Sequence, residues 1–269
     1  MGKQYLLHYL KFCYHFVNCL IRKSQPYLRL TPFVRGKILF FDKRRGRFFS
    51  LYSRSFADSQ TADEIYTKND YDVSFLARAN DISDKYNKIL AQGKTPLIID
   101  CGANIGLASR YFAQCYPEAR IVAIEPDGAN IEMAKKHCES FVNVDLRCAA
   151  IGADAGFAEI TNMDAGSNAF QVKRSTQAGG NVEVVTIDHL LDENVDTELF
   201  MVKIDIEGFE RDLFAKNTDW LKDCYLLIIE LHDWMLPKSG SSNAFLRAVS
   251  KEARDFVYRR ENVFSISNN

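Results

Sequence analysis

Disulfide and zinc-site patterns are absent from this sequence, although it contains seven cysteines. No two cysteines form a C-x-x-C pair, and no cysteine and histidine have the spacing of a structural zinc site. An odd number of cysteines scattered through apolar runs is typical of buried free thiols in a reducing compartment. We therefore expect neither a disulfide framework nor a bound metal, and we expect a cytoplasmic protein.

Acidic side chains are scarce at one end of the chain. Residues 1–54 contain one acid, Asp42, against 12 lysines and arginines, whereas residues 55–269 contain 34 acids against 22 basic residues. A basic leader on an acidic body favours a phosphate-rich or anionic-membrane neighbour for the leader. Pairing of the basic residues with the acidic body explains the same asymmetry equally well, so both interpretations stay open.

An uninterrupted apolar run long enough to span a membrane is missing near the N-terminus. The first 22 residues are largely apolar, with polar positions at spacings of three and four: His8, Lys11, His15, Asn18 and Arg22. This spacing predicts an amphipathic helix. No small-residue cleavage site follows, so a signal peptide is not expected. The helix either packs on the body or a partner, or lies in a membrane interface, where residues 1–50 would make peripheral contact at the inner face.

What the second part of the chain does contain is a regular alternation of apolar strands and amphipathic helices. The expected strands are 97–101, 120–125, 144–149, 157–161, 182–187, 199–205 and 224–231, and the expected helices are 106–115, 128–139, 208–215 and 243–253. This alternation predicts an α/β fold with a doubly wound, mostly parallel, Rossmann-like sheet.

The first part of the chain has a different pattern. Residues 36–54 favour short strands around a turn, and residues 60–92 favour a polar helix. We therefore expect an N-terminal helical and β extension over 1–94 and a catalytic domain over 95–269. Within that domain, residues 162–181 are predicted to form a long loop, and such loops in compact domains are often functional.

The turn after the first strand of the catalytic domain is the most informative segment. Gly102 and Gly106 let the backbone approach a ligand closely, and the helix that follows offers free N–H groups. Their G-x-x-x-G spacing differs from the G-x-G-x-x-G that packs a pyrophosphate. Asp100 suits a cationic or amine-bearing ligand, while Glu125, at the end of the next strand, suits the two hydroxyls of a ribose. Together these features predict a nucleoside-cofactor site, although the turn alone also fits an ordinary strand-to-helix connection.

Five segments of the chain resemble a known family. They are D-C-G-A-N-I-G at 100–106, I-E-P-D at 124–127, V-T-I-D at 185–188, V-K-I-D-I-E-G-F-E at 202–210 and I-I-E-L-H-D at 228–233. Together they resemble the FkbM family of class I methyltransferases over roughly residues 95–235. The resemblance implies an S-adenosylmethionine-dependent O-methyltransferase that acts on a sugar hydroxyl in a polysaccharide, glycolipid or natural-product pathway.

The same resemblance implies which residues bind S-adenosyl-L-methionine. Those carried over to its methionine and ribose end are Asp100, Gly102, Ala103, Asn104 and Gly106. Glu125, followed by Pro126, would hold the ribose diol. Ala150 and Ile151, after the third strand, would flank the adenine.

The base that removes the acceptor's proton is expected at the carboxyl ends of two later strands. Asp205 ends one strand, and Glu230 and His232 lie on one face at the end of another. If these strands are neighbours, Asp205 and His232 converge on one hydroxyl. His232 titrates near neutrality and is the first choice for the base, with Asp205 as the second choice or as its orienting partner. Glu210 is expected only to favour the dipole of the following helix.

Three other functions were weighed against this one. A nicotinamide-dependent oxidoreductase or epimerase would need G-x-G-x-x-G and a catalytic pair such as Tyr-x-x-x-Lys, and neither is present. A non-catalytic binding module would be expected to have an eroded cofactor turn, whereas this turn is intact. A nucleic-acid methyltransferase would more usually have an N/D-P-P-Y/F-type motif where this chain has D-I-E-G. The expected partner is a small-molecule or glycan acceptor, with no nucleic acid; the oligomeric state is not predicted.

Overall fold

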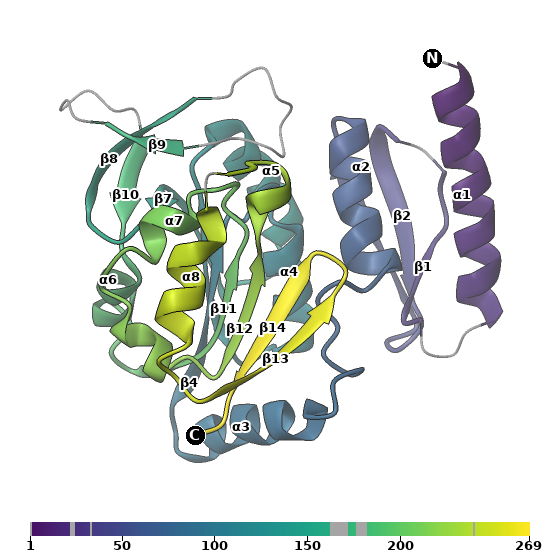
Figure 1. Ribbon diagram of the computed structural model, residues 1–269. Helices are drawn as coiled ribbons and strands as arrows, with labels where there is room; N and C mark the ends of the chain where they lie inside the picture. Colours follow the sequence, from purple (N-terminus) through teal and green to yellow (C-terminus); the bar gives the residue numbers. More distant parts are fainter. Residues whose placement is uncertain (1, 22–24, 33, 162–171, 176–181, 239) are drawn as a thin grey trace. The chain divides into compact units, whose positions relative to one another are not determined.

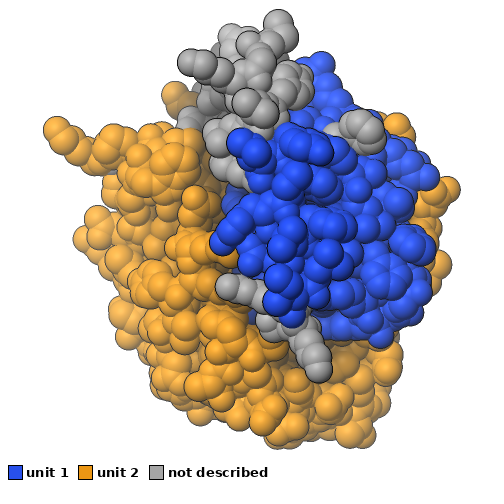
Figure 2. Space-filling model, turned by 90° about the vertical axis from the view of Figure 1, so that its right-hand side faces the viewer, with its two compact units in different colours: residues 1–72 blue, residues 73–269 orange. Residues whose placement is uncertain are grey.

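The computed structural model divides into two compact units, residues 1–72 and residues 73–269 (Figures 1 and 2). It describes every residue except 1, 22–24, 33, 162–171, 176–181 and 239, and for residues 2–8 and 11 it describes the backbone alone. The division falls before the boundary expected at residue 94. Helix α3 (Ala79–Ala91) belongs to the second unit because it packs on that unit's central sheet.

The first unit is a small antiparallel sheet with helices. Its elements are α1 (Gly2–Ile21), β1 (Tyr27–Arg29), β2 (Gly36–Asp42), β3 (Arg47–Ser53), α2 (Phe56–Ala62) and the π-helical turn η1 (Asp63–Thr67). The sheet order is β1-β2-β3, and Tyr27, Phe40 and Tyr66 meet in its buried centre. The expected strands and N-terminal helix are confirmed. The expected helix over 60–92 is wrong in its middle, because the chain leaves helical geometry between Thr67 and Ala79.

The second unit is built on a seven-stranded sheet in the order β13-β14-β12-β11-β4-β5-β6. The strands are β4 (Thr95–Cys101), β5 (Arg120–Glu125), β6 (Val144–Cys148), β11 (Thr197–Ile204), β12 (Leu226–Glu230), β13 (Arg254–Arg259) and β14 (Asn262–Ser267). The five strands from β12 to β6 are parallel, whereas β14 is antiparallel to both of its neighbours. The predicted doubly wound, mostly parallel α/β fold is confirmed.

Helices cover both faces of this sheet (Figure 1). They are α4 (Leu107–Cys115) and α5 (Gly128–Cys138) on one face, and α6 (Ile187–Asp192), α7 (Glu210–Leu213), α8 (Ser241–Val249) and the 3-10 turns η2 (Asp219–Lys222) and η3 (His232–Trp234) on or near the other. Leu97 and Ile99 of β4 pack in one buried cluster with Phe245 of α8. Because β4 is buried on both faces, its sequence is an apolar run rather than an alternation.

A second, four-stranded sheet lies beside the carboxyl ends of the central strands, in the order β7-β10-β8-β9. Its strands are β7 (Ala150–Ile151), β8 (Gly156–Ile160), β9 (Val172–Arg174) and β10 (Val182–Val185). Two of the expected strands, 157–161 and 182–187, therefore exist but lie outside the central sheet. The long loop expected over 162–181 falls mostly outside the described residues, and its described part forms β9.

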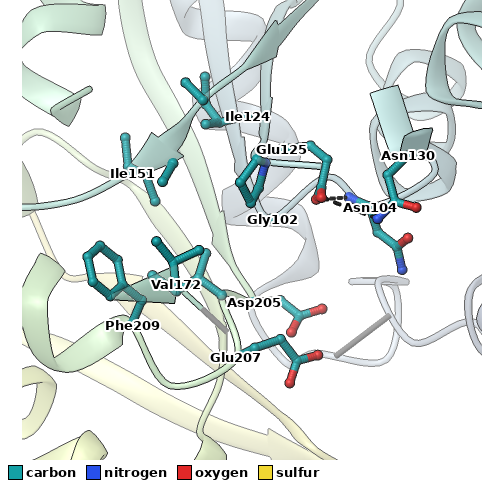
Figure 3. A pocket seen from close by; sticks show the side chains of 14 residues that line it. Gly102, Asn104, Ile124, Glu125, Asn130, Ile151, Val172, Asp205, Glu207 and Phe209 are labelled. Atoms are coloured by element: carbon teal, nitrogen blue, oxygen red, sulfur yellow. Dashed lines mark hydrogen bonds between the residues drawn. The ribbon is translucent and has the colours of Figure 1, made fainter. Parts of the chain in front are cut away.

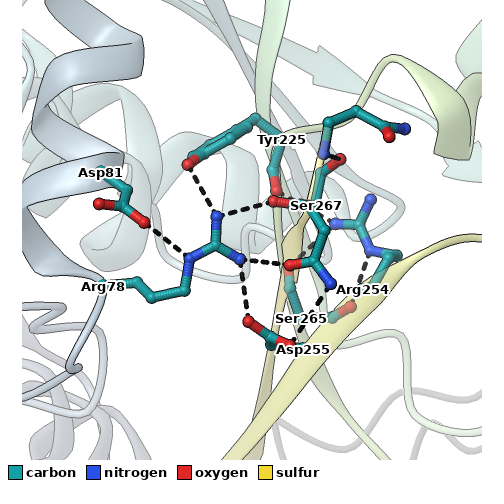
Figure 4. A network of polar contacts seen from close by, with 9 residues as sticks. Arg78, Asp81, Tyr225, Arg254, Asp255, Ser265 and Ser267 are labelled. Carbon is teal, nitrogen blue, oxygen red and sulfur yellow. Dashed lines mark hydrogen bonds and ion pairs between the residues drawn. The ribbon is translucent and has the colours of Figure 1, made fainter.

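The C-terminal hairpin β13–β14 was not predicted from the sequence, and a polar network anchors it (Figure 4). Arg78, at the start of α3, donates to Asp255 at 3.0 Å and to the backbone carbonyl of Ser267 at 3.0 Å. It also pairs with Asp81 and donates to the Tyr225 hydroxyl. This network ties α3 to the edge of the central sheet. Within the described part of the chain, no helix has the length and apolar character needed to cross a membrane.

Candidate functional site

The turn between β4 and α4 brings the backbone unusually close to its neighbours. Gly102 has φ +82°, and a Cβ at this position would lie 1.8 Å from the carbonyl oxygen of Asp205. Gly106 has φ +77°, and a Cβ there would lie 2.7 Å from the Cβ of Ala134. No side chain fits in these spaces, so both glycines are required by contact as well as by conformation. The turn can therefore pack between the end of β11 and α5 only with glycine at both positions.

Glu125, the last residue of β5, faces this turn and is held by N–H donors on both carboxylate oxygens. Its Oε2 accepts from the backbone N–H of Asn104 at 2.8 Å, and its Oε1 accepts from the N–H of Asp127 at 3.0 Å and from the Asn130 amide at 3.2 Å. Burial raises the pKa of Glu125, and these donors oppose that rise. The carboxylate is thus fixed in position, with acceptor capacity left over.

A pocket opens between the turn, Glu125 and the second sheet (Figure 3). Its lining residues come from the ends of β4, β5 and β11 and from β7 and β9: Gly102, Asn104, Ile124, Glu125, Pro126, Asn130, Ala149, Ala150, Ile151, Val172, Asp205, Ile206, Glu207 and Phe209. One side of the pocket is apolar, and the other presents carboxylates and amides. Six of the nine residues expected to bind the cofactor lie in this lining; Asp100, Ala103 and Gly106 do not.

Asp100 faces away from the pocket lining and has protein partners of its own. It is fully buried, accepts a hydrogen bond from the Ser109 hydroxyl at 2.6 Å, and lies 3.1 Å from the ammonium of Lys203. Lys203 sits directly across from Asp100 in the β11–β4 register and donates to the carbonyl of Gly102 at 2.7 Å. The cation beside Asp100 is therefore this lysine, and the two residues together fix the glycine turn. The sequence interpretation of Asp100 as a ligand-facing acid is not supported by this placement.

Carboxylates surround the imidazole of His232 at the ends of β11 and β12. The Nδ1 atom lies 2.9 Å from Oε1 of Glu210, and Nε2 lies 3.5 Å from Oδ1 of Asp205, 3.5 Å from Oε2 of Glu207 and 3.6 Å from Oε1 of Glu230. The expectation that Asp205 and His232 converge from neighbouring strands is confirmed. We call these five residues the carboxylate cluster.

Charges within the cluster decide which member can act as a base. Burial alone would lower the pKa of His232, but hydrogen bonds to Asp205 and Glu210 raise it to about 11. The ring is then protonated near neutral pH and cannot accept a proton. The raised pKa argues against His232 as the base, so that role stays a prediction; the sequence did not reveal how many carboxylates would meet the ring.

The carboxylates of the cluster fall into two groups. Burial opposes ionisation of Asp205, but Lys203 and His232 prevail and lower its pKa to about 2. Burial and the charge of Asp205 raise the pKa of Glu207 to about 7 and that of Glu230 to about 8. A carboxyl that titrates near neutrality is suited to proton transfer, and Glu207 is the one that lines the pocket.

Glu207 and Glu210 are among the acids that the sequence places at this strand end, but their contacts were not predicted. Glu207 adopts a left-handed conformation with φ +53°, a strained geometry that is common at functional sites. Glu210 is fully buried and contacts His232, a contact that its expected role in favouring the helix dipole did not include. Phe209 and Asn130 line the pocket without having been predicted. Among these four, only the repeated acids of D-I-E-G-F-E gave a signal in the sequence.

Three members of the carboxylate cluster also have the arrangement of possible metal ligands. Ligand atoms of Asp205, Glu207 and His232 all lie within 4.8 Å of one another. A metal would require the His232 ring to lose its proton, against the pull of the surrounding carboxylates. The expectation that no metal is needed stays a prediction.

Comparison with known proteins gives one match that covers most of the second unit. The family model described as the methyltransferase FkbM domain matches residues 100–259. In addition, a segment of 63 residues is 38% identical to methyltransferase sdnD of Sordaria araneosa, which covers 23% of this chain and 18% of that protein. The chain thus matches less than a fifth of this curated relative's length.

Solved structures give weaker likenesses. A putative O-methyltransferase from Klebsiella pneumoniae is 12% identical, with a TM-score of 0.41 over 74% of this chain and 83% of that one. The crystal structure of monomeric WbdD is 14% identical, with a TM-score of 0.39 over 70% of this chain and 40% of that one.

Proposed function

The chain belongs to the FkbM family of methyltransferases, and we propose that it transfers a methyl group from S-adenosylmethionine to a hydroxyl oxygen of a sugar. The observation that carries the proposal is the fixed carboxylate of Glu125 beside the Gly102 turn, at the carboxyl ends of parallel strands. This is where a doubly wound sheet binds nucleosides. The family match favours this function over the nicotinamide-dependent alternative.

The residues of the pocket fit such a donor. Asn104 Oδ1 is buried and has no hydrogen-bond partner among the described residues, so it is available to a ligand donor. Gly102 lines the pocket with backbone alone, and Ile124 and Ile151 offer apolar surface for a flat base. Glu125 would hold the ribose hydroxyls. Asp100 would act behind the site, through Lys203, by fixing the turn.

Bound S-adenosylmethionine supplies a methyl group that is already activated for transfer. The remaining work for the protein is to hold the acceptor oxygen in line and to remove its proton. Proximity of this kind contributes up to about 7–11 kcal/mol of barrier lowering. A pocket with an apolar side and a polar side can orient an acceptor, and the polar side carries both Asp205 and Glu207.

We assign the proton-accepting role to Glu207. Its Oε2 lies 3.5 Å from Nε2 of the protonated His232. The other oxygen, Oε1, is therefore the one that we assign to accept the proton of the acceptor hydroxyl. The imidazolium would stabilise the carboxylate before transfer and weaken its charge repulsion with Asp205. Glu230, the other carboxyl with a raised pKa, lies outside the pocket lining and is the second choice.

The sugar acceptor rests on the family resemblance, and one assay tests the whole proposal. Labelled S-adenosylmethionine is incubated with the full chain and a panel of nucleotide sugars and glycans, in parallel with Glu125→Ala. The matched control is Glu132→Ala, which removes an exposed acid from α5, the helix that follows Glu125 in the chain. We expect transfer to a sugar hydroxyl by the wild type and by the control, and none by Glu125→Ala. Transfer by Glu125→Ala at the wild-type rate would refute the donor site.

A further inference from the structure

Helix α1 presents an apolar face to solvent. Its described apolar residues that lie more than half exposed, between 52% and 75%, are Tyr9, Leu10, Tyr14, Val17, Leu20 and Ile21. Four of them follow at spacings of four, three and four residues, so they lie on one side of the helix. We call this set the outer face. A continuous exposed apolar surface of this kind marks an interaction site rather than ordinary surface variation.

The outer face is not the side of α1 that folds the first unit. Phe12, Phe16 and Cys19 occupy the other side, where they line a cavity together with Phe56 of α2, and Cys19 is only 3% exposed. Figure 1 shows β1 and β2 beside α1 on one side and no element of the first unit on the other. Helix α1 therefore has one apolar side that packs within the first unit and a second apolar side that no element of that unit covers.

The polar stripe expected from the sequence does not cover this second side. His15 and Asn18, two of the stripe's residues, are half-buried, while Tyr14, Val17 and Leu20 are exposed. A helix that packed only on its own body would have the opposite arrangement. This difference argues against a helix that packs only on its own body.

A basic turn lies at the end of the same helix. Lys43 donates from Nζ to the carbonyl oxygen of Cys19 at 2.8 Å, which places the β2–β3 turn beside the C-terminal end of α1. Arg44 and Arg47 in this turn are exposed, and the ring of Phe48 is 64% exposed. We call residues 43–48 the basic turn. An apolar helix face next to exposed arginines and an aromatic ring is the composition of an interfacial membrane anchor.

We propose that the outer face and the basic turn together dock on a membrane surface that contains anionic lipids, with α1 lying in the plane of the interface. Charge complementarity selects this occupant, because residues 1–54 carry 12 basic side chains and one acid. Each lysine or arginine near such a surface strengthens binding about fivefold. The apolar side chains enter the boundary between headgroups and acyl chains.

Vesicle sedimentation with the full chain tests this proposal without any methyl-transfer assay. The chain is mixed with vesicles of phosphatidylserine and phosphatidylcholine, or with vesicles of phosphatidylcholine alone. We expect it to sediment with the anionic vesicles, to do so less as salt rises, and to stay in solution with the neutral ones. A wild-type chain that does not sediment with anionic vesicles overturns the proposal.

Two variants separate the apolar and the charged contributions. Val17→Ser with Ile21→Ser should weaken binding at least tenfold, whereas Val142→Ser with Val195→Ser, at exposed apolar sites of the second unit, should not change it. Unchanged binding by the first variant contradicts the proposal.

Arg44→Gln with Arg47→Gln should weaken binding on the order of twentyfold. The control Lys88→Gln with Lys136→Gln removes the same charge from exposed positions of the second unit and should bind as the wild type does. Circular dichroism checks that each variant keeps its helix content. If sedimentation velocity instead reveals a dimer that Val17→Ser with Ile21→Ser abolishes, the outer face belongs to a second copy and the membrane proposal fails.

Discussion

The two halves of the candidate site lie at the same edge of one sheet but are built differently. The donor corner, formed by the Gly102 turn and Glu125, depends on backbone geometry: a Cβ would not fit, and N–H groups hold the carboxylate. The carboxylate cluster depends on side chains, since four acids meet one imidazole. The donor corner is thus determined by steric fit, whereas the carboxylate cluster is determined by the interactions among its charged side chains. Each should therefore fail in its own way when it is disturbed.

The largest effect is expected from filling the donor corner. Gly102→Ala would put a Cβ 1.8 Å from the Asp205 carbonyl oxygen, so either the turn or the end of β11 must move. We expect binding of S-adenosylhomocysteine to fall below detection in calorimetry. Gly128→Ala is the matched control, because a Cβ there meets nothing within 4 Å. Equal affinity of the two variants would show that the turn does not shape the donor site.

In the cluster, removing the base should leave donor binding intact and slow the chemistry. Glu207→Gln keeps the shape of the side chain, and we expect kcat to fall about 10²–10⁴-fold. In the wild type, the rate should rise with pH through about 7, the pKa of Glu207, because the base must lose its proton first. Full turnover by Glu207→Gln would move the role to Glu230, the other carboxyl with a raised pKa.

The outcome for the fold shows what local sequence can predict. Strands β4, β5 and β11 and the glycine turn were predictable, because long apolar runs and a strand-turn-helix pattern are local signals. Hairpin β13–β14 was not, since its buried positions include Asn262, Ser265 and Ser267, which gave no apolar pattern.

The candidate site divides in the same manner. Glu125 and Gly102 were found because each ends a strand or opens a turn. The roles of Lys203 and Glu210 depend on contacts between residues far apart in the chain: Lys203 with Asp100, and Glu210 with His232. The protonation of His232 depends on all of its neighbours together. No spacing within one segment could have revealed these contacts.

Asp100 contacts Lys203, which also contacts the Gly102 turn and Asp205, so replacing Asp100 should lower the free energy of unfolding. Asp100→Asn would leave the buried ammonium of Lys203 short of its nearest carboxylate, at a cost of about 3 kcal/mol or more in the free energy of unfolding. Glu198→Gln is the comparison, since Glu198 pairs with Lys85 and Lys94 at a more open site and should cost about 1 kcal/mol or less. Chemical denaturation measures both. Equal costs would mean that the Asp100–Lys203 pair does not hold the turn.

The charge balance of the cluster should also make stability depend on pH. Because the folded-state pKa of His232 is raised to about 11 from an ordinary 6.5, its stabilising effect is full below pH 6.5 and is lost as pH rises. Between pH 6.5 and 9 we expect the contribution of His232 to the free energy of unfolding to fall by at most about 1.4 kcal/mol per pH unit, and the raised pKa values of Glu207 and Glu230 make the total fall steeper below pH 8. His232→Gln should flatten this profile, and His189→Gln, at an exposed histidine, should not. A wild-type profile that is level over this range would contradict the assigned protonation.

The smallest effect is expected from metal removal. Asp205, Glu207 and His232 have suitable spacing for a metal, but the raised pKa of His232 keeps a proton on the ring, which would have to leave before the ring could bind a cation. Dialysis against a chelator should therefore leave methyl transfer unchanged. If the chelator abolishes transfer and magnesium or manganese restores it, the cluster is a metal site. Glu207 would then be a metal ligand and could not act as the base.

The central claim, that the donor corner is shaped for S-adenosylmethionine, is tested most directly by calorimetry on the unmodified chain. The account predicts that S-adenosylhomocysteine binds with one site per chain, that NAD does not bind, and that Glu125→Ala removes the heat of binding. Binding of NAD in place of S-adenosylhomocysteine, or undiminished affinity in Glu125→Ala, would contradict it.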